Sequence, residues 1–166
     1  MRKLLAGLIL AGTVGAAQPA FAARATVNFE GYMPGTVVVR TNERRLYYVL
    51  GDGKALRYPV GVGKAGKAWS GSAFIVRMVR NPDWSPPAEV KRDKPSLPNV
   101  IKGGTPQNPM GAAALVLSGG EYAIHGTNVP KSIGGFVSYG CIRMYNEDVK
   151  DLYDRVHFGT RVVVER

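Results

Sequence analysis

The chain has 166 residues, of which 45% are hydrophobic, and its 22 Lys and Arg outnumber its 12 Asp and Glu to give a formal net charge of +10. The length suits one domain, and the apolar content excludes a disordered chain, which could not bury enough surface to offset its conformational entropy. A single cysteine excludes an internal disulfide framework and a cysteine-rich zinc module, and two histidines are too few for a metal site made of histidines alone.

The start of the chain has the pattern of a secretory signal peptide, which we expect over residues 1–22. A positive beginning at Arg2 and Lys3 precedes an apolar run over 4–14, and Ala-Phe-Ala at 20–22 matches a cleavage site. The apolar run is shorter than the roughly 18 residues that span a bilayer as a helix. We therefore expect an exported domain that begins at residue 23, with an uncleaved membrane anchor as the alternative.

Short runs rich in Val, Ile, Tyr and Phe recur between turn signals, and each has the length of a strand. The runs over 36–41 and 46–50 flank residues 42–45, and we predict that these two runs form a hairpin joined by that turn. The 21 Gly and 11 Pro also favour short strands with many turns over a helical bundle. We predict strands over 36–41, 46–50, 55–62, 73–79, 113–118, 122–124 and 160–165.

Residues 81–110 show no regular period and contain seven of the 11 prolines. A loop of this length in a compact domain is functional or disordered. Trp84 within it favours an ordered loop that packs over another part of the molecule.

One helix is predicted near the end of the chain. Asn146 is its expected N-cap, acidic residues follow in the first turn, and apolar residues recur at helical spacing from Val149 to Val156. The apolar face indicates packing and implies no chemistry.

The basic residues are dispersed along the chain, and no predicted helix carries a basic stripe. Binding to nucleic acid favours basic residues gathered on one face, so we expect no nucleic-acid partner. Two interpretations of the charge stay open: attraction to an anionic polymer outside the cytoplasm, or a surface that only aids solubility.

Two short segments concentrate the residue types used in catalysis, Ala-Ile-His-Gly-Thr-Asn at 123–128 and Val-Ser-Tyr-Gly-Cys-Ile-Arg-Met at 137–144. A lone thiol in an exported protein is unusual, because oxidising compartments pair or consume thiols. Cys141 is therefore either a small buried hydrophobe or a nucleophile. His125, at the end of an apolar run, would supply the base that a nucleophile needs, although a lone histidine is more often structural.

The neighbours of Cys141 fit a nucleophile. Gly140 lets the backbone bend, and the N–H groups of Gly140 and Cys141 are candidate donors to an oxyanion. Residues two apart in an extended segment share a face, so Arg143 would lie beside Cys141 and either lower the thiol pKa or hold a substrate carboxylate. A surface ion pair is the alternative for Arg143, and a turn-forming serine is the alternative for Ser138.

The pairing of Ile-His-Gly-Thr-Asn at 124–128 with Ser-Tyr-Gly-Cys-Ile-Arg-Met at 138–144 resembles the L,D-transpeptidase catalytic domain of the YkuD family. The similarity to that family extends to other segments, which are residues 34–50, 81–87 and 97–111 and the closing helix and strand. The resemblance implies a mainly β, single-domain fold of sandwich or barrel type over residues 23–166, with one short C-terminal helix.

The resemblance also implies a periplasmic enzyme of the cell wall that acts on peptidoglycan tetrapeptide stems. Cys141 would attack the carbonyl between the third-residue diamino acid and D-Ala, release D-Ala and form a thioester, with His125 as base and then acid. An amine would resolve the thioester, either from another stem, giving a 3→3 cross-link, or from an outer-membrane protein. We expect a monomer that needs no metal or other cofactor and is acylated by carbapenems.

The site implied by the resemblance has three groups of residues. They are His125 and Cys141 for catalysis, Gly140, Ser138 and Tyr139 for the oxyanion and its loop, and Arg143, Gly126, Thr127 and Trp84 for substrate binding.

Two departures from the family stand out. The family often has His where this chain has Tyr139, which can still donate a hydrogen bond, and Thr-Pro-x-Gly where it has Trp-Ser-Gly at 69–71. No side chain in the sequence clearly orients His125, so we expect a backbone carbonyl to do so. Two alternatives to a transpeptidase stay open: a hydrolase on the same scaffold, in which water resolves the thioester, and a non-catalytic peptidoglycan-binding module.

Overall fold

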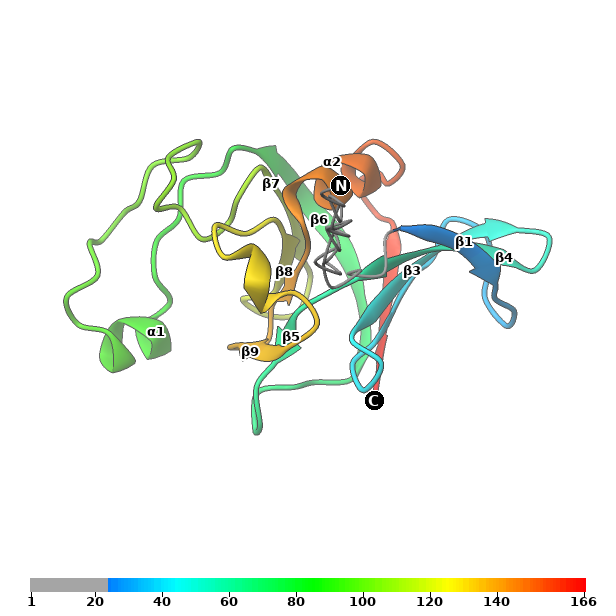
Figure 1. Cartoon of the computed structure of the whole chain (residues 1–166), viewed down its shortest axis with the longest axis horizontal. Coiled ribbons are helices and arrows are strands. Elements are labelled where there is room, and N and C mark those ends of the chain that lie inside the picture. Colours follow the sequence, from blue (N-terminus) through cyan, green and yellow to red (C-terminus); the bar gives the residue numbers. More distant parts are fainter. Residues whose placement is uncertain (1–23) are drawn as a thin grey trace, which may run out of the picture.

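The computed structural model describes residues 24–166, so the expected signal peptide lies outside the described residues. Within them, no helix is long and apolar enough to cross a membrane. Strands dominate, and the two short helices α1 (Ala88–Asp93) and α2 (Asn146–Tyr153) lie in different parts of the molecule (Figure 1). The prediction of a mainly β single domain is confirmed.

The strands form two sheets. The larger sheet has nine strands in the order β1-β4-β3-β2-β11-β6-β7-β8-β10, and the smaller sheet pairs β5 with β9. The strand bounds are β1 (Ala25–Asn28), β2 (Val37–Arg40), β3 (Arg45–Gly51), β4 (Lys54–Pro59), β5 (Val62–Gly63), β6 (Gly71–Arg80), β7 (Ala113–Leu117), β8 (Ala123–His125), β9 (Phe136–Ser138), β10 (Ile142–Arg143) and β11 (Arg161–Glu165).

Each predicted run overlaps a strand, although several strands begin or end outside the predicted bounds, and the predicted hairpin joins β2 to β3. The run over 55–62 is divided, because β4 ends at Pro59, which has no N–H to extend the ladder. The prediction of a single helix was incomplete. Helix α1 lies within 81–110 and directly follows Pro87, whose fixed backbone angle suits the start of a helix.

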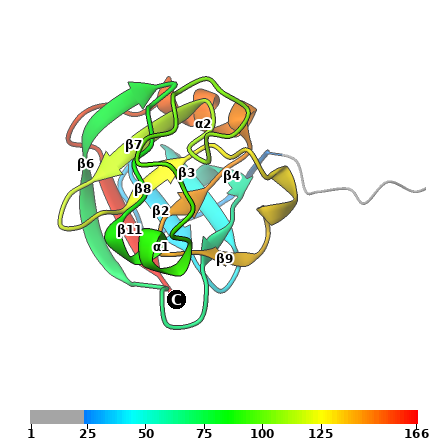
Figure 2. The same ribbon diagram turned by 90° about the vertical axis from the view of Figure 1, so that its left-hand side faces the viewer.

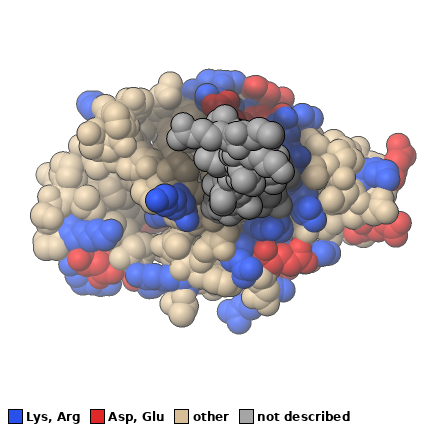
Figure 3. All heavy atoms as spheres, in the orientation of Figure 1, with Lys and Arg blue, Asp and Glu red and all other residues tan. Residues whose placement is uncertain are grey.

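The main core lies between the larger sheet and α2. Val37 and Val39 of β2 pack into this core, whereas Val38 packs on the opposite face with Phe29 and Tyr47. This alternation follows the two-residue period of a strand and buries β2 on both faces. Figure 3 shows Lys and Arg scattered over the visible face with acidic residues between them, as the dispersed sequence pattern predicts.

Candidate active site

Two short parallel strands bring the two candidate motifs together. Strands β8 and β10 pair with Ile124 opposite Ile142 and His125 opposite Arg143. Both isoleucines are buried in the main core. Because side chains alternate along a strand, His125 and Arg143 face away from that core. Cys141 lies two residues before Arg143 and so faces the same way. The expected shared face of Cys141 and Arg143 is confirmed.

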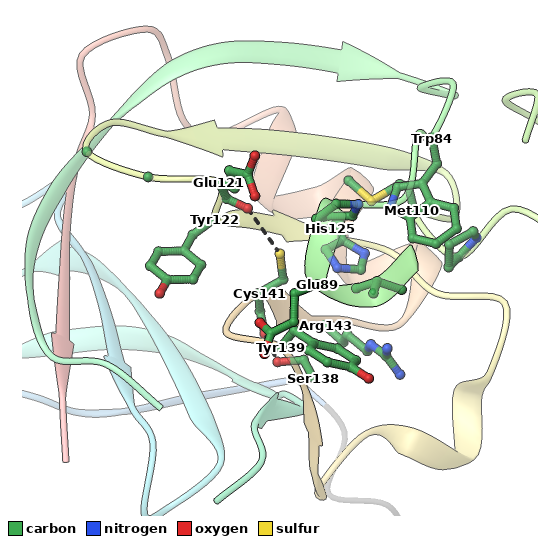
Figure 4. Close-up of a pocket in the computed structure, with 15 residues that line it drawn as sticks. Trp84, Glu89, Met110, Glu121, Tyr122, His125, Ser138, Tyr139, Cys141 and Arg143 are labelled. Atoms are coloured by element: carbon green, nitrogen blue, oxygen red, sulfur yellow. Dashed lines mark hydrogen bonds between the residues drawn. The ribbon is translucent and has the colours of Figure 1, made fainter. Parts of the chain in front are cut away.

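The side chains of that face line a cavity of about 310 Å³. Figure 4 shows the Cys141 thiol and the His125 imidazole directed into it from neighbouring elements. The predicted residues that it brings together are Trp84, His125, Ser138, Tyr139, Cys141 and Arg143, and the other lining residues are Pro87, Glu89, Val90, Pro109, Met110, Gly119, Gly120, Glu121 and Tyr122.

The imidazole of His125 is buried and neutral at physiological pH. The side chain is 4% exposed, and its burial, reinforced by the positive charge of Arg143, lowers its pKa to about 4. Nδ1 lies 2.6 Å from the carbonyl oxygen of Gly126, which confirms the expected backbone orienter. If Nδ1 donates to this carbonyl, the neutral ring carries its lone pair on Nε2, the tautomer that a general base using Nε2 requires. The Pro109 carbonyl also acts on the ring and, like that of Gly126, raises the pKa against the effect of burial.

The thiol of Cys141 is partly buried and protonated. Burial raises its pKa, as does the charge of Glu121, whereas the Ala123 backbone N–H and the charge of Arg143 act in the opposite direction. The thiol contacts the Glu121 carbonyl oxygen at 3.8 Å, and no hydrogen bond between thiol and imidazole is found among residues 24–166. The lowered imidazole pKa and the raised thiol pKa leave both groups neutral near pH 7.

Arg143 places an uncompensated cation in the cavity. Its Nε is buried without a hydrogen-bond partner, and the side chain takes part in none of the ion pairs of the described chain. Burial lowers its pKa below the usual range of arginine. A guanidinium held in this way is matched by the two oxygens of a carboxylate.

Hydrogen bonds within the loop before Cys141 correct one expectation. Ser138 Oγ donates to the Cys141 carbonyl at 2.6 Å and accepts the Gly140 N–H at 3.1 Å. The Gly140 N–H is therefore occupied, which leaves the Cys141 N–H as the candidate oxyanion donor. Gly140 has a φ of +122°, and an added Cβ would lie 2.3 Å from the Tyr122 ring. A glycine is therefore required at position 140 by the positive φ and by the close approach of the Tyr122 ring.

Gly126 and Thr127 are not among the residues that line this cavity, so the structure gives no support to their predicted contact with substrate. Both residues instead pack against the side chain of Asn146. Its Oδ1 accepts the N–H groups of Ala112 and Thr127 at 3.1 and 3.0 Å, and a Cβ on Gly126 would lie 2.2 Å from that oxygen. Asn146 is also the first residue of α2 and not its cap, because its side chain joins neighbouring loops.

Several residues of the site were not predicted from the sequence. Trp69 stacks on Tyr122 with ring centroids 5.0 Å apart and donates from Nε1 to the Gly140 carbonyl at 3.0 Å, so both rings support the loop before Cys141. The departure from the family pattern at 69–71 was the one feature of the sequence that could have pointed to a role for Trp69. Glu121 enters the cavity because the Gly-Gly turn before it directs the chain back beside Cys141.

Replacing Glu121 with Gln should lower the pKa of the Cys141 thiol, because it removes a nearby negative charge that raises this pKa. Alkylation by iodoacetamide, followed between about pH 7 and 11, measures the thiolate directly and should begin at lower pH in the variant. Glu30→Gln, an exposed change of the same kind on a residue outside the cavity, should leave the profile unchanged. An unmoved or raised profile for Glu121→Gln would contradict this electrostatic assignment.

Comparisons with known proteins bear on this site. The family model of the L,D-transpeptidase catalytic domain, YkuD, matches residues 34–164. The probable L,D-transpeptidase ErfK/SrfK of Escherichia coli K12 is 38% identical over 157 residues, which are 88% of this chain and 50% of that protein. This chain thus spans about half the length of that relative.

Two solved structures share the fold. A crystal structure from Brucella melitensis, named as a probable carnitine operon oxidoreductase, is 42% identical with a TM-score of 0.58, over 90% of this chain and 96% of that one. L,D-transpeptidase 3 from Mycobacterium tuberculosis, in complex with a faropenem-derived adduct, is 16% identical with a TM-score of 0.59, over 79% of this chain and 60% of that one.

Proposed function

Because the chain belongs to the YkuD family of L,D-transpeptidase catalytic domains, we propose that it is a cysteine acyltransferase of the cell wall, with Cys141 as nucleophile and His125 as general base. One observation carries the proposal: the only cysteine of the chain shares a cavity with a buried neutral imidazole and an unpaired arginine cation. These are the groups that covalent acyl transfer from a carboxylate-bearing donor requires.

The acyl donor is a peptidoglycan tetrapeptide stem. His125 Nε2 takes the thiol proton while Cys141 Sγ attacks the carbonyl carbon that joins the third-residue diamino acid to D-Ala, and the Cys141 N–H stabilises the resulting oxyanion. The imidazolium then gives its proton to the amine of D-Ala, which leaves a thioester. In the second step an acceptor amine loses a proton to His125, attacks the thioester and restores the thiol.

The cavity walls suit this donor. The Arg143 guanidinium, partly buried and lacking a described partner, would bind a carboxylate of the stem. Trp84, Met110 and Val90 provide an apolar wall along which the peptide would lie. Ser138 holds the nucleophile loop through its two hydrogen bonds and need not touch the substrate.

Incubation of the purified protein with disaccharide tetrapeptide, followed by mass spectrometry, tests the proposal. A cross-linked dimer together with free D-Ala would support transpeptidation. Tripeptide without any dimer would support the hydrolase. Binding of unchanged substrate would support a peptidoglycan-binding module and would contradict the acyltransferase.

The name of the Brucella relative points to different chemistry, so one motif needs a closer look. Gly-Val-Gly-Lys-Ala-Gly at 61–66 has the spacing of a dinucleotide-binding fingerprint. That fingerprint binds a pyrophosphate at the N-terminus of a helix that follows a strand. Here β5 ends at Gly63, and the next element is strand β6. The motif therefore gives no support to a nucleotide-dependent oxidoreductase.

The setting of the reaction is also a proposal. We propose that residues 1–22 direct export and are removed, and that residues 23–166 act as a monomer in the periplasm. The acceptor amine would come from a second stem or from an outer-membrane protein.

A further inference from the structure

Residues 81–110, called the flap below, leave the larger sheet after β6 and rejoin it before β7. Its base is held by backbone pairing, since Trp84 and Ile101 exchange two N–H···O bonds of 2.9 and 2.8 Å. The buried Asn108 side chain adds bonds to the carbonyls of Pro82 and Ile101 at 2.9 and 3.0 Å. Figures 1 and 2 show helix α1 at the outer end of the flap, on the side of the molecule away from β1 and β4.

The outer end of the flap has few contacts with the rest of the molecule. Within α1, Val90 is the one buried residue. In the part of the chain that the structure describes, two polar contacts join α1 to elements outside the flap. The Tyr139 hydroxyl donates to Asp93 Oδ2 at 2.6 Å, and Lys67 forms an ion pair with Glu89.

Both contacts are charge-assisted, because each has a carboxylate as acceptor, and both lie near the surface, where solvent weakens them. The Tyr139 ring is itself held, because the Lys64 Nζ lies 3.8 Å from its centroid. The contact between Tyr139 and Asp93 is therefore one of the two described polar restraints on α1, and it is the one that joins α1 to the loop before Cys141.

We infer that Tyr139 is a positioning residue that latches the flap, because its hydroxyl holds Asp93 and thereby keeps α1 in place as the wall of the donor cavity opposite Cys141. The flap end contributes Pro87, Glu89 and Val90 to that wall. The inference rests on the proposed function, in which this cavity receives the acyl donor. Loss of the latch lowers the fraction of molecules with a complete cavity, and the apparent affinity for donor falls in proportion.

Hydrogen exchange without substrate tests the latch itself. The N–H groups of Lys91 and Lys94 bond within α1, so their exchange reports opening of the flap end. Tyr139→Phe keeps the ring and its Lys64 contact but removes the hydroxyl, and should speed exchange over 88–97 by up to about tenfold, the usual scale for one hydrogen bond to a charged group. Tyr153→Phe, on α2, is the matched control and should change nothing there.

Kinetics with disaccharide tetrapeptide test the consequence for the donor. Tyr139→Phe and Asp93→Ala should each raise KM about tenfold with a much smaller effect on kcat, because the latch shapes the cavity and leaves the thiol and imidazole unchanged. Asp93→Asn keeps an acceptor oxygen and should recover part of the loss. The double variant Tyr139→Phe with Asp93→Ala should be no worse than either single change, because both remove one interaction.

Unchanged exchange over 88–97 in Tyr139→Phe would overturn the latch, as would additive effects in the double variant. These results are separate from the fate of the proposed function. If the wild-type protein released no D-Ala from the donor, the acyltransferase proposal would fall, while the exchange comparison would still decide whether Tyr139 holds α1.

Discussion

Replacement of Cys141 by alanine should abolish D-Ala release from the tetrapeptide donor, with a fall of at least about 10⁴-fold. Alanine cannot form the thioester, and the remaining groups of a covalent catalytic site retain little activity once the nucleophile is gone. A coupled assay for free D-Ala measures the loss. Intact-mass spectrometry after exposure to a carbapenem measures acylation separately, and should show one adduct on the wild type and none on the variant.

The composition of the chain makes this experiment unusually clean. Cys141 is the only cysteine in 166 residues, so a thiol reagent that labels the folded protein reports on this side chain alone. Cys141→Ser keeps the size and polarity of the residue, and a melting temperature near that of the wild type would show that the fold survives. Persistent D-Ala release by the Cys141→Ala protein would remove the thioester from the mechanism.

The sequence predicted the parts of the site that depend on local periodicity. The two-residue period of a strand places Cys141 and Arg143 on one face, and the apolar run before His125 places this residue at a strand end. The β-branched runs likewise predicted the central strands. Local pattern sufficed here because the residues concerned lie within the same strand or directly beside it.

The remaining features depend on contacts between residues distant in the sequence. Asn146 accepts the Thr127 N–H across 19 positions, and Tyr139 bonds to Asp93 across 46. Neither contact leaves a periodic signal in the chain. The Gly140 N–H was assigned to an oxyanion on its position alone, whereas Ser138 reaches it through a turn whose geometry the residue types do not determine.

Burial also changes the expected pH dependence of the reaction. The ordinary pKa of histidine, about 6.5, predicts an inflection near neutrality. In the folded chain, burial and the charge of Arg143 lower the pKa of His125 to about 4, while burial raises the pKa of the Cys141 thiol. In the proposed reaction the pair would therefore be a neutral thiol and a neutral imidazole over the physiological range, and the proton would move during the attack and not before it.

Replacement of His125 by alanine should accordingly lower kcat/KM by about 10²–10⁴-fold, the usual contribution of a general base. The wild-type rate should rise with pH through about 4, because the imidazole accepts a proton only after losing its own, and should then stay level through neutrality. In the variant this rise at low pH, the acid limb of the profile, should vanish. The residual rate should increase with the fraction of Cys141 present as thiolate, which forms only at alkaline pH. Donor turnover and iodoacetamide alkylation, each measured across the pH range, give both profiles.

The second histidine provides the control. His157 is exposed, follows α2 and does not line the cavity, so His157→Ala should keep both the rate and the acid limb. Loss of the limb in His125→Ala but not in His157→Ala would assign the limb to the buried imidazole. Turnover of His125→Ala within a few-fold of the wild type, or a wild-type limb near the ordinary histidine pKa, would contradict a buried neutral base and favour a thiolate activated by Arg143 alone, since that cation already acts to lower the thiol pKa.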